Sequence, residues 1–517
     1  MFQIKSGGGW HAVLYVFKKA WTVGLFKLWK ALSSRNACKT CALGMGGKKG
    51  GMTNEQGAWP EVCKKSVQAM ISDMQGQIKP DFFRQPVKKL QGWTSPQLEA
   101  AGRLAFPVRV VAGGTHYEPI SWESAFDSIA KALKECAPNR SFFYFSGRSS
   151  NEAGFLLQLF ARVFGTNNVN NCSYYCHQAS GVALGGSVGT GTATLSLEDL
   201  ERSDFVILAG ANPASNHPRL MTILKNIRKR GGEVVVINPL KELGLLRFSV
   251  PSDPISLVFG TAIASDYLQV KVGGDIALYH GLAKSLMENH PQALHQEFLA
   301  QATDQYNEYH QLVSKITWQE IEEASGIPRV LIERVAVKYS KAQNAVFAWC
   351  MGLTHHVHGV ANIQTLVNLA LLRGMVGRTN AGLLPIRGHS NVQGMGSMAV
   401  TPTLKKEVFA KLAQAGINAP TTPGLDTMAC MQAATRGEID VAFCLGGNLF
   451  GSNPDARFAH EAFEKTKTVV YLNTTLNTGH AWGLGQETII LPVCARDEEP
   501  QPTTQESMFN YVRLSDG

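Results

Sequence analysis

Three cysteines near the N-terminus could hold a metal. Cys38 and Cys41 form a Cys-x-x-Cys pair, and Cys63 follows after a stretch rich in glycine. Thiolates at this spacing can bind neighbouring irons of a cluster or one zinc, and glycine-rich backbone can aim N–H groups at sulfur. Half a zinc site, a redox dithiol and ordinary buried thiols are the alternative interpretations. The segment is a candidate metal site that needs support from the rest of the chain.

Two further segments supply that support. Cys176 stands beside His177, and Arg387 lies in a stretch of Gly, Asn and Gln. A thiolate can ligate a soft metal while a neighbouring imidazole moves a proton, and a guanidinium suits bidentate capture of a carboxylate or oxyanion. A buried cysteine beside a structural histidine and a surface arginine on a turn are the alternatives. In combination, the three segments indicate redox chemistry with an anion-binding group.

The composition is that of a multi-domain enzyme. The chain has 517 residues, 44% of them apolar, and 50 glycines, so it can bury several cores while its loops approach a large ligand closely. The formal charge is +9, and the Lys and Arg are scattered apart from a mildly basic stretch between Lys18 and Lys49, which favours an anionic cofactor or substrate over nucleic acid. Ten irregularly spaced cysteines predict a reduced, cytoplasmic protein rather than a disulfide framework.

No stretch of the sequence is long and apolar enough to span a bilayer. Residues 10–32 are apolar but are interrupted by four lysines, at positions 18, 19, 27 and 30. This pattern predicts an amphipathic helix, and such a helix more often packs on its own protein than on a membrane.

One β-α-β unit is well marked. A strand at 204–209 leads through the loop 210–218 to a helix at 219–230 and a second strand at 233–237. The strands of such a unit are parallel, and its ligand lies at their carboxyl ends. Upstream, a buried strand at 141–145 and a capped helix at 151–164 are predicted by the same patterns.

A weaker copy of this unit appears later. A strand at 440–445 is followed by the loop 446–454, a helix and a strand at 468–472. In both copies the strand runs into Gly-x-Asn and then a second Asn before proline or His-Pro. We interpret this as an internal repeat of two nucleotide-binding-like lobes with parallel sheets. The alternative is that any two β-α units share a glycine after the strand.

These segments carry a resemblance to a known family. Residues 35–47, the Cys176-His177 pair, residues 210–219 and the Arg387 loop resemble the molybdopterin oxidoreductase family, closest to its YdeP-type, formate-dehydrogenase-like branch. The resemblance covers essentially the whole chain. It implies a multi-domain α/β architecture of the formate dehydrogenase and dimethyl sulfoxide reductase kind, with two pseudo-repeated parallel-sheet lobes.

With this resemblance the chain divides into four parts. They are an N-terminal helix and iron–sulfur region at 1–103, a first lobe with the Cys-His motif at 104–340, a second lobe with the Arg387 loop at 341–490, and, at 491–517, the start of a linker to a C-terminal domain that is missing here. The last part is polar and proline-rich, which is the pattern of a linker.

The resemblance also implies cofactors and residue roles. The cofactors are a bis(molybdopterin guanine dinucleotide) molybdenum centre and one 4Fe–4S cluster. Cys176 would ligate molybdenum, His177 would handle a proton, Arg387 would hold a substrate carboxylate, and Lys65 would carry electrons between pterin and cluster. The implied cluster ligands are Cys38, Cys41 and Cys63. The implied dinucleotide-binding residues are Gly210, Asn212, Asn216, His217, Asn238, Pro239, Gly274, Asp275, Gly447 and Asn448.

The chain departs from the family pattern at three places. Met45 stands where the family's cluster motif has a cysteine, which leaves the fourth cluster ligand open. His389 stands where formate dehydrogenases commonly carry glutamine, which puts formate itself in doubt as the substrate. The family's C-terminal domain, which closes over the cofactor, is not found in this chain.

The sequence therefore predicts a molybdenum-dependent oxidoreductase. It would move two electrons between a small, formate-like substrate and the metal and pass them through an iron–sulfur cluster to an unidentified partner. A truncated or non-catalytic molybdopterin-binding protein is the alternative. A nucleotide-dependent dehydrogenase is a weaker one, because no G-x-G-x-x-G turn with a later acidic residue is present.

Overall fold

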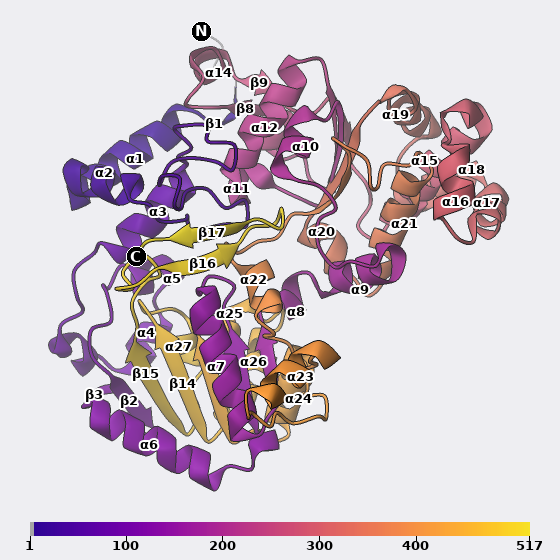
Figure 1. Cartoon of the computed structure of the whole chain (residues 1–517). Coiled ribbons are helices and arrows are strands. Elements are labelled where there is room, and N and C mark those ends of the chain that lie inside the picture. Colours follow the sequence, from indigo (N-terminus) through magenta and orange to yellow (C-terminus); the bar gives the residue numbers. More distant parts are fainter. Residues whose placement is uncertain (1–4) are drawn as a thin grey trace.

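The computed structural model describes residues 5–517, and two α/β lobes dominate it (Figure 1). Each lobe is built around its own sheet, with helices on both faces. Within residues 5–517 no helix has the length and apolar content needed to cross a membrane. The α/β class with parallel sheets that the sequence predicts is confirmed.

The first sheet has five parallel strands in the order β10-β7-β6-β11-β12. Their bounds are β10 Asp266–Leu268, β7 Glu233–Ile237, β6 Phe205–Ala209, β11 Ala345–Trp349 and β12 Gly382–Pro385. Side chains of β6, β7 and β11 are buried on both faces, as near-continuous apolar runs in parallel sheets require. One face is covered by α15 Asp275–Asn289, α19 Arg329–Lys341 and α21 Gly359–Leu371, and the other by α10 Leu197–Arg202 and α12 Pro218–Lys229.

The second sheet has seven strands in the order β3-β2-β15-β14-β13-β4-β5. Their bounds are β3 Glu118–Pro119, β2 Val108–Val111, β15 Glu487–Pro492, β14 Thr468–Asn473, β13 Val441–Leu445, β4 Ser141–Phe145 and β5 Val169–Asn171. Only β2 and β3 run antiparallel to their neighbours. Helices α6 Trp122–Glu135 and α7 Asn151–Phe164 cover one face, and α24 Thr427–Thr435 and α26 Ala456–Glu464 cover the other.

The two β-α-β units predicted from the sequence are present, one in each sheet. Strands β6 and β7 are parallel neighbours in the first, as are β13 and β14 in the second. The predicted helix at 151–164 is α7, with the Ser150 hydroxyl accepting from the Ala153 N–H at its start. Each repeat loop contains a four-residue helix that was not predicted from the sequence. These helices are α11 Pro213–Asn216 and α25 Leu449–Ser452.

The sheets do not follow the contiguous lobes predicted for 104–340 and 341–490. The first sheet combines segments 205–268 and 345–385, and the second combines 108–171 and 441–492. The chain thus enters the second lobe, builds the first and returns. Hydrophobic pattern identifies a strand but does not say which sheet it joins, because pairing depends on distant segments.

The N-terminal segment forms α1 Trp10–Val23 and α2 Leu25–Ser33, so the single helix expected at 10–32 is wrong. The chain breaks at Gly24, whose φ of 92° lies in the left-handed region that glycine adopts most easily. Both helices rest on α3 Lys64–Asp73, through a small core that includes Ala20, Leu28 and Val67.

The C-terminal segment differs from the linker predicted for 491–517. Residues Thr503–Glu506 (β16) and Val512–Ser515 (β17) form an antiparallel hairpin between the two lobes (Figure 1). At its turn Met508 and Phe509 are buried, and the Met508 N–H donates to the Ala42 carbonyl at 2.8 Å. Polar composition suggested a linker, but these few apolar residues fix the segment to the N-terminal loop.

Candidate functional site

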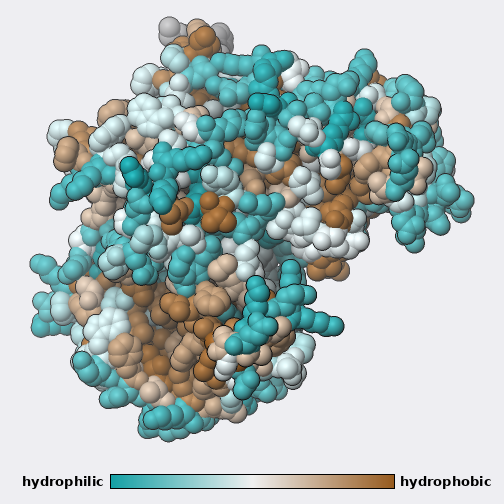
Figure 2. Space-filling view, viewed as in Figure 1, coloured by the Kyte–Doolittle hydropathy of each residue, from teal (hydrophilic) through white to brown (hydrophobic). Residues whose placement is uncertain are grey.

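A cavity of about 1130 Å³ lies between the two lobes. Segments that follow β4, β13 and β14 line it from the second sheet, and segments that follow β11 and β12 line it from the first. Its wall therefore consists largely of loops at the carboxyl ends of parallel strands, where open α/β sheets bind their ligands. Lys39 and Asp73 of the N-terminal region complete the wall. Figure 2 shows apolar surface over α7, whose Leu156 and Phe160 border the same cavity.

Cys176 lines this cavity at the end of the short helix α8 Ser173–Cys176. Burial raises the pKa of its thiol, with Cys172 and Cys350 adding to the effect, whereas the Arg387 guanidinium and the Gly388 N–H oppose it. A Cβ built on Gly388 would lie 4.0 Å from the Cys176 sulfur and meet nothing else. The backbone here thus leaves open space beside a thiol that faces a cation.

His177 is buried under the cavity wall and does not line the cavity. Its Nδ1 lies 3.0 Å from the Ser180 hydroxyl, and its Nε2 lies 3.1 Å from the Ile386 carbonyl. Because a carbonyl only accepts, Nε2 carries the proton and Nδ1 accepts from Ser180. Burial, followed by the charge of Arg387, lowers the pKa of His177 to about 3, so the ring is neutral.

Arg387 is buried beside Cys176 and has no carboxylate partner among the described residues. Its guanidinium donates to the Ser173 hydroxyl at 3.0 Å and to the Gly191 carbonyl at 2.7 Å, and its Nε has no partner. His217 supports it from behind, because the His217 Nε2 donates to the Arg387 carbonyl at 2.7 Å. A buried, uncompensated guanidinium is costly and suits an anionic ligand.

The sequence analysis did not single out Cys172, although it lines the same cavity. Its sulfur accepts from the Gly147 N–H at 3.2 Å and lies 3.2 Å from Nδ1 of His389. Burial raises the pKa of Cys172 to about 11, and burial lowers that of His389 to about 4. The four-residue spacing from Cys172 to Cys176, one helical turn, was the available signal.

The three N-terminal cysteines lie near one another. Burial raises the pKa of Cys41 and raises that of Cys63 to about 12, and the neighbouring Cys38 thiol adds to both shifts. Cys63 caps α3, and Lys65 opposes the shift of Cys63. A backbone bridge joins Cys41 to His389, so this loop adjoins the Arg387 loop.

The three thiols fit an iron–sulfur cluster in residue type and in their nearness to one another. They provide one ligand fewer than the four that such a cluster takes. Across residues 5–517, no three His, Cys, Asp or Glu side chains converge as a site for a single metal ion. Met45, where the family motif has a cysteine, is buried, and its carbonyl accepts from the Cys38 N–H at 2.7 Å. Its thioether carries no charge, so Cys38, Cys41 and Cys63 are the residues that would supply charged donors when a metal binds.

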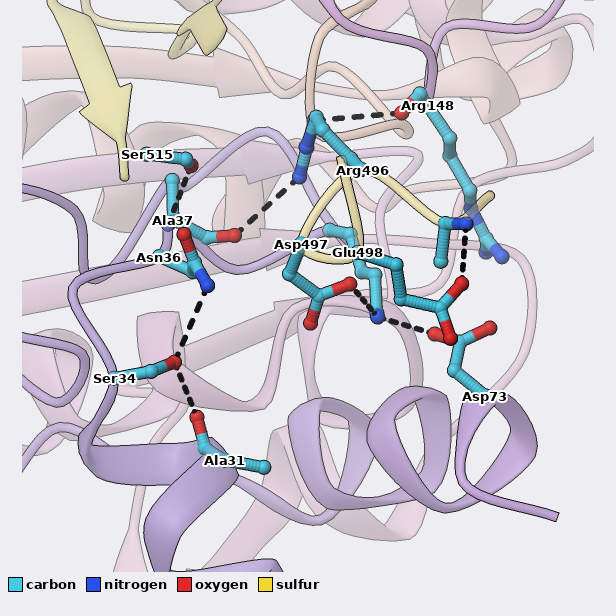
Figure 3. A network of polar contacts seen from close by, with 12 residues as sticks. Ala31, Ser34, Asn36, Ala37, Asp73, Arg148, Arg496, Asp497, Glu498 and Ser515 are labelled. Carbon is cyan, nitrogen blue, oxygen red and sulfur yellow. Dashed lines mark hydrogen bonds and ion pairs between the residues drawn. The ribbon is translucent and has the colours of Figure 1, made fainter. Parts of the chain in front are cut away.

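Figure 3 shows how this loop is fastened to the cavity wall. The buried Arg496 reaches the Ala37 carbonyl on one side and the Arg148 carbonyl on the other, each at 3.4 Å. The Lys39 ammonium bridges Asp73 and Asp497. Arg148 and Arg496 also line the cavity, and neither was predicted from the sequence, because charged residues on loops give no local signal of what they face.

The predicted dinucleotide-binding residues divide into two groups. Gly447 and Asn448 line the cavity. The others lie at the carboxyl edge of the first sheet or just beyond it, outside the cavity lining; they are Gly210, Asn212, Asn216, His217, Asn238, Pro239, Gly274 and Asp275. Burial raises the pKa of Asp275 to about 6, against the opposing charges of His356 and His358.

Known proteins resemble this chain in sequence and in fold. The model of the family described as molybdopterin oxidoreductase matches residues 86–499. Protein YdeP of Escherichia coli is 37% identical over 488 residues, which cover 89% of this chain and 64% of YdeP. Formate dehydrogenase H of Escherichia coli is 29% identical over 385 residues, which cover 71% of this chain and 51% of that enzyme.

Among solved structures, acetylene hydratase from Pelobacter acetylenicus shares the fold. Its TM-score is 0.62 at 17% sequence identity, over 88% of this chain and 60% of the hydratase. The chain therefore spans about 64% of the length of YdeP and less of the other two proteins.

Proposed function

Because this chain belongs to the molybdopterin oxidoreductase family, we propose that it binds a molybdenum–pterin cofactor at the cavity between its lobes and takes part in a two-electron oxidation or reduction. The observation that carries the proposal is the Cys176 thiol at the cavity wall, next to the buried Arg387 guanidinium. Such a pair provides a soft metal ligand and an anion-binding group side by side.

The electrostatics support an anionic ligand at this place. Burying a guanidinium without a carboxylate costs several kcal/mol, roughly, and a bound anion restores the lost interactions. Arg387 also favours the thiolate form of Cys176, which is the form that binds a metal. In this proposal Arg387 orients the carboxylate of a small, formate-like substrate; formate is suggested by the relative formate dehydrogenase H.

Glycine and asparagine at the strand ends suit the dinucleotide portion of the cofactor. Gly446 and Gly447 have φ of 63° and 68°, and Gly447 lies at the cavity with Asn448. Amides at such positions can bind phosphates, ribose or base. We propose the bis(molybdopterin guanine dinucleotide) form, held by Gly447 and Asn448 of the second lobe and by the predicted residues of the first lobe. When bound, the molybdenum centre would supply the redox chemistry.

His177 is the proposed proton-handling neighbour. It is neutral and holds its proton on Nε2, toward the Ile386 carbonyl. Neither the ring nor Ser180 at its Nδ1 lines the cavity, so in this proposal His177 also positions the segment after β12 by donating to the Ile386 carbonyl. A His177→Gln variant keeps one donor and one acceptor but cannot titrate, so it tests the proton role separately from the positioning role.

Electrons would leave through the N-terminal region. Cys38, Cys41 and Cys63 are the proposed ligands of a 4Fe–4S cluster, with Lys65 beside Cys63. The buried cations Arg496 and Arg513 face Cys38 and would offset the negative charge of a thiolate-bound cluster. The electron partner is not identified by these residues, and a cytoplasmic location is part of the proposal.

The second candidate is a chain that binds the cofactor without turnover. It is favoured by the position of His177, because the proposed proton-handling ring is buried and does not line the cavity. Activity and cofactor binding are therefore tested separately.

The first experiment is metal analysis of anaerobically purified protein. About one molybdenum and about four irons per chain support the full proposal; molybdenum without iron removes the cluster; neither metal overturns the proposal. Cys176→Ala should abolish formate-dependent reduction of a dye, while the matched control Cys136→Ala, a buried cysteine in the α6 core, keeps it. Cofactor retention without activity in the wild-type chain supports the second candidate.

A further inference from the structure

Helix α1 exposes a stripe of large apolar side chains. Trp10, Leu14, Phe17 and Trp21 are all exposed, with Phe17 at 63% and Trp21 at 80%. At about 100° per residue these four positions lie within roughly 60° of one another on the helix. The packing on the protein expected from the sequence therefore holds for only one side of the helix.

Helix α2 continues the same kind of surface. Leu25, Phe26 and Trp29 are exposed, Phe26 at 81%. The opposite side of α2 is covered, because Leu28 and Leu32 are buried against α3. We call the seven exposed side chains of the two helices the α1–α2 apolar face. Figure 1 places both helices at the outer margin of the molecule, and Figure 2 shows brown and pale surface there.

The net charge of the chain is concentrated in the N-terminal segment that carries this face. The sequence has 49 Lys and Arg against 40 Asp and Glu, and nine of the basic residues lie in the first 54 positions, where no acidic residue occurs. The rest of the chain is therefore balanced, and its whole net charge of +9 belongs to this segment. Lys18, Lys27 and Lys30 are exposed on α1 and α2 themselves.

From this combination we propose that the α1–α2 apolar face docks on the surface of an anionic lipid bilayer. Tryptophan and phenylalanine beside lysine, without acidic residues, are the composition of helices that lie in the lipid interface. The aromatic rings enter the headgroup region while the lysines meet anionic headgroups. Helices of 14 and 9 residues cannot span a bilayer, so the attachment is peripheral.

Docking through this face would orient the molecule relative to the membrane. Both helices pack on α3, which begins at Lys64 with Cys63 as its cap. Docking would thus hold the side of the molecule that carries the three N-terminal cysteines toward the membrane. The proposal rests on exposure and charge alone and stands whether or not a cofactor is bound.

The test is co-sedimentation of the purified full chain with lipid vesicles. The chain should bind vesicles of phosphatidylcholine mixed with phosphatidylglycerol, and bind pure phosphatidylcholine vesicles at least about tenfold more weakly. Raising the salt concentration should weaken the binding further, because added ions screen surface charge.

Two double variants separate the contributions. Trp21→Ser with Phe26→Ser removes apolar contacts, and Lys18→Glu with Lys27→Glu reverses charge; each should lower vesicle binding by about tenfold or more. The matched control is Leu312→Ser with Val330→Ser, two exposed apolar residues on α17 Tyr306–Lys315 and on α19, which should bind like the wild type.

Three results would overturn the proposal. The first is no binding to either kind of vesicle, and the second is equal binding by the wild type and both double variants. The third is a dimer in light scattering that Trp21→Ser with Phe26→Ser dissociates, without vesicle binding, because the face would then serve a second copy of the chain. Circular dichroism of each variant verifies that the fold is retained.

Discussion

The loop after β6 and the loop after β13 are built alike and yet face different surroundings. In both, a glycine of positive φ ends the strand, and an asparagine two residues after it caps a four-residue helix. Gly210 of the first loop packs against the backbone of Gly352, and its N–H donates to the Ile237 carbonyl at 2.9 Å. Gly446 of the second borders the cavity. The same local motif is thus part of the packed interior in one lobe and part of the candidate site in the other.

The strongest test of this difference is alanine at each glycine. A Cβ at Gly210 would lie 2.8 Å from Gly352 backbone atoms at a φ of 55°, so Gly210→Ala should lower the free energy of unfolding by about 3 kcal/mol. A Cβ at Gly446 would lie 3.2 Å from the Ser146 Cβ, and Gly446→Ala should cost about 1 kcal/mol. Urea unfolding measures both; equal losses would contradict the comparison.

Acid should destabilise the second loop through a buried histidine. His480 is buried, its Nδ1 accepts from the Asn477 N–H at 3.0 Å, and Asn477 donates to the Gly447 carbonyl at 2.9 Å. Burial lowers the pKa of His480 to about 3, whereas an unfolded histidine titrates near 6.5, roughly. The unfolded state therefore binds more protons in this window, and stability is lost as the pH falls from about 6.5 toward 3, at up to about 1.4 kcal/mol per pH unit from this residue.

The measurement is a series of urea unfolding curves between pH 7 and the onset of acid unfolding. His480→Gln should flatten the slope, since glutamine does not titrate. A control with His290→Gln, a histidine at the end of α15 in the other lobe, should leave the slope unchanged. An unchanged slope in His480→Gln would remove His480 as its cause.

The two asparagine caps sharpen the comparison further. Asn212 accepts from the Ser215 N–H at 3.3 Å and Asn448 from the Gly451 N–H at 2.9 Å. Alanine at either position should cost about 1 kcal/mol. Asn448→Ala should also release more of the bound molybdenum than Asn212→Ala, because Asn448 lines the cavity and Asn212 lies outside its lining. Parallel unfolding curves and metal analysis of the two variants distinguish the outcomes; equal metal loss would place both loops at the ligand.

The smallest effect is expected at the start of β13, the end of this strand that lies away from the loop. Asp440 precedes β13 and pairs with both Nε and Nη2 of Arg140, at 2.7 and 2.9 Å, which holds its pKa below the usual range. Arg140 is partly exposed, so Arg140→Ala should cost less than about 1 kcal/mol and less still in high salt. Thermal unfolding at two salt concentrations tests this; a loss independent of salt would point to packing.

Prediction from the sequence succeeded where the signal is local. Continuous apolar runs identified β4 and β6, and Ser150 identified the start of α7, because burial of both faces and end capping leave marks within a few residues. The break at Gly24 and the hairpin at 503–515 were missed. The hairpin is fixed by contacts of a few residues with a distant segment, whereas the break at Gly24 follows from the left-handed φ of one glycine.

The candidate site was predictable only in part. Cys176 and Arg387 were found because thiols and guanidinium groups in glycine-rich loops are unusual, and the structure brings them together. Arg148 and Arg496 were not found, because an arginine on a loop carries no sign that it will line a cavity. Their roles depend on the Cys38 loop and the C-terminal segment meeting there.

The sequence by itself determined the family, the two β-α-β units and the reactive residue types, because these depend on residue identity and on spacing along the chain. The tertiary structure alone decided which strands share a sheet, which of two similar loops borders the cavity, and which side of α1 and α2 is left exposed. Those properties arise from contacts between segments that are far apart in the chain, and residue spacing does not reveal such contacts.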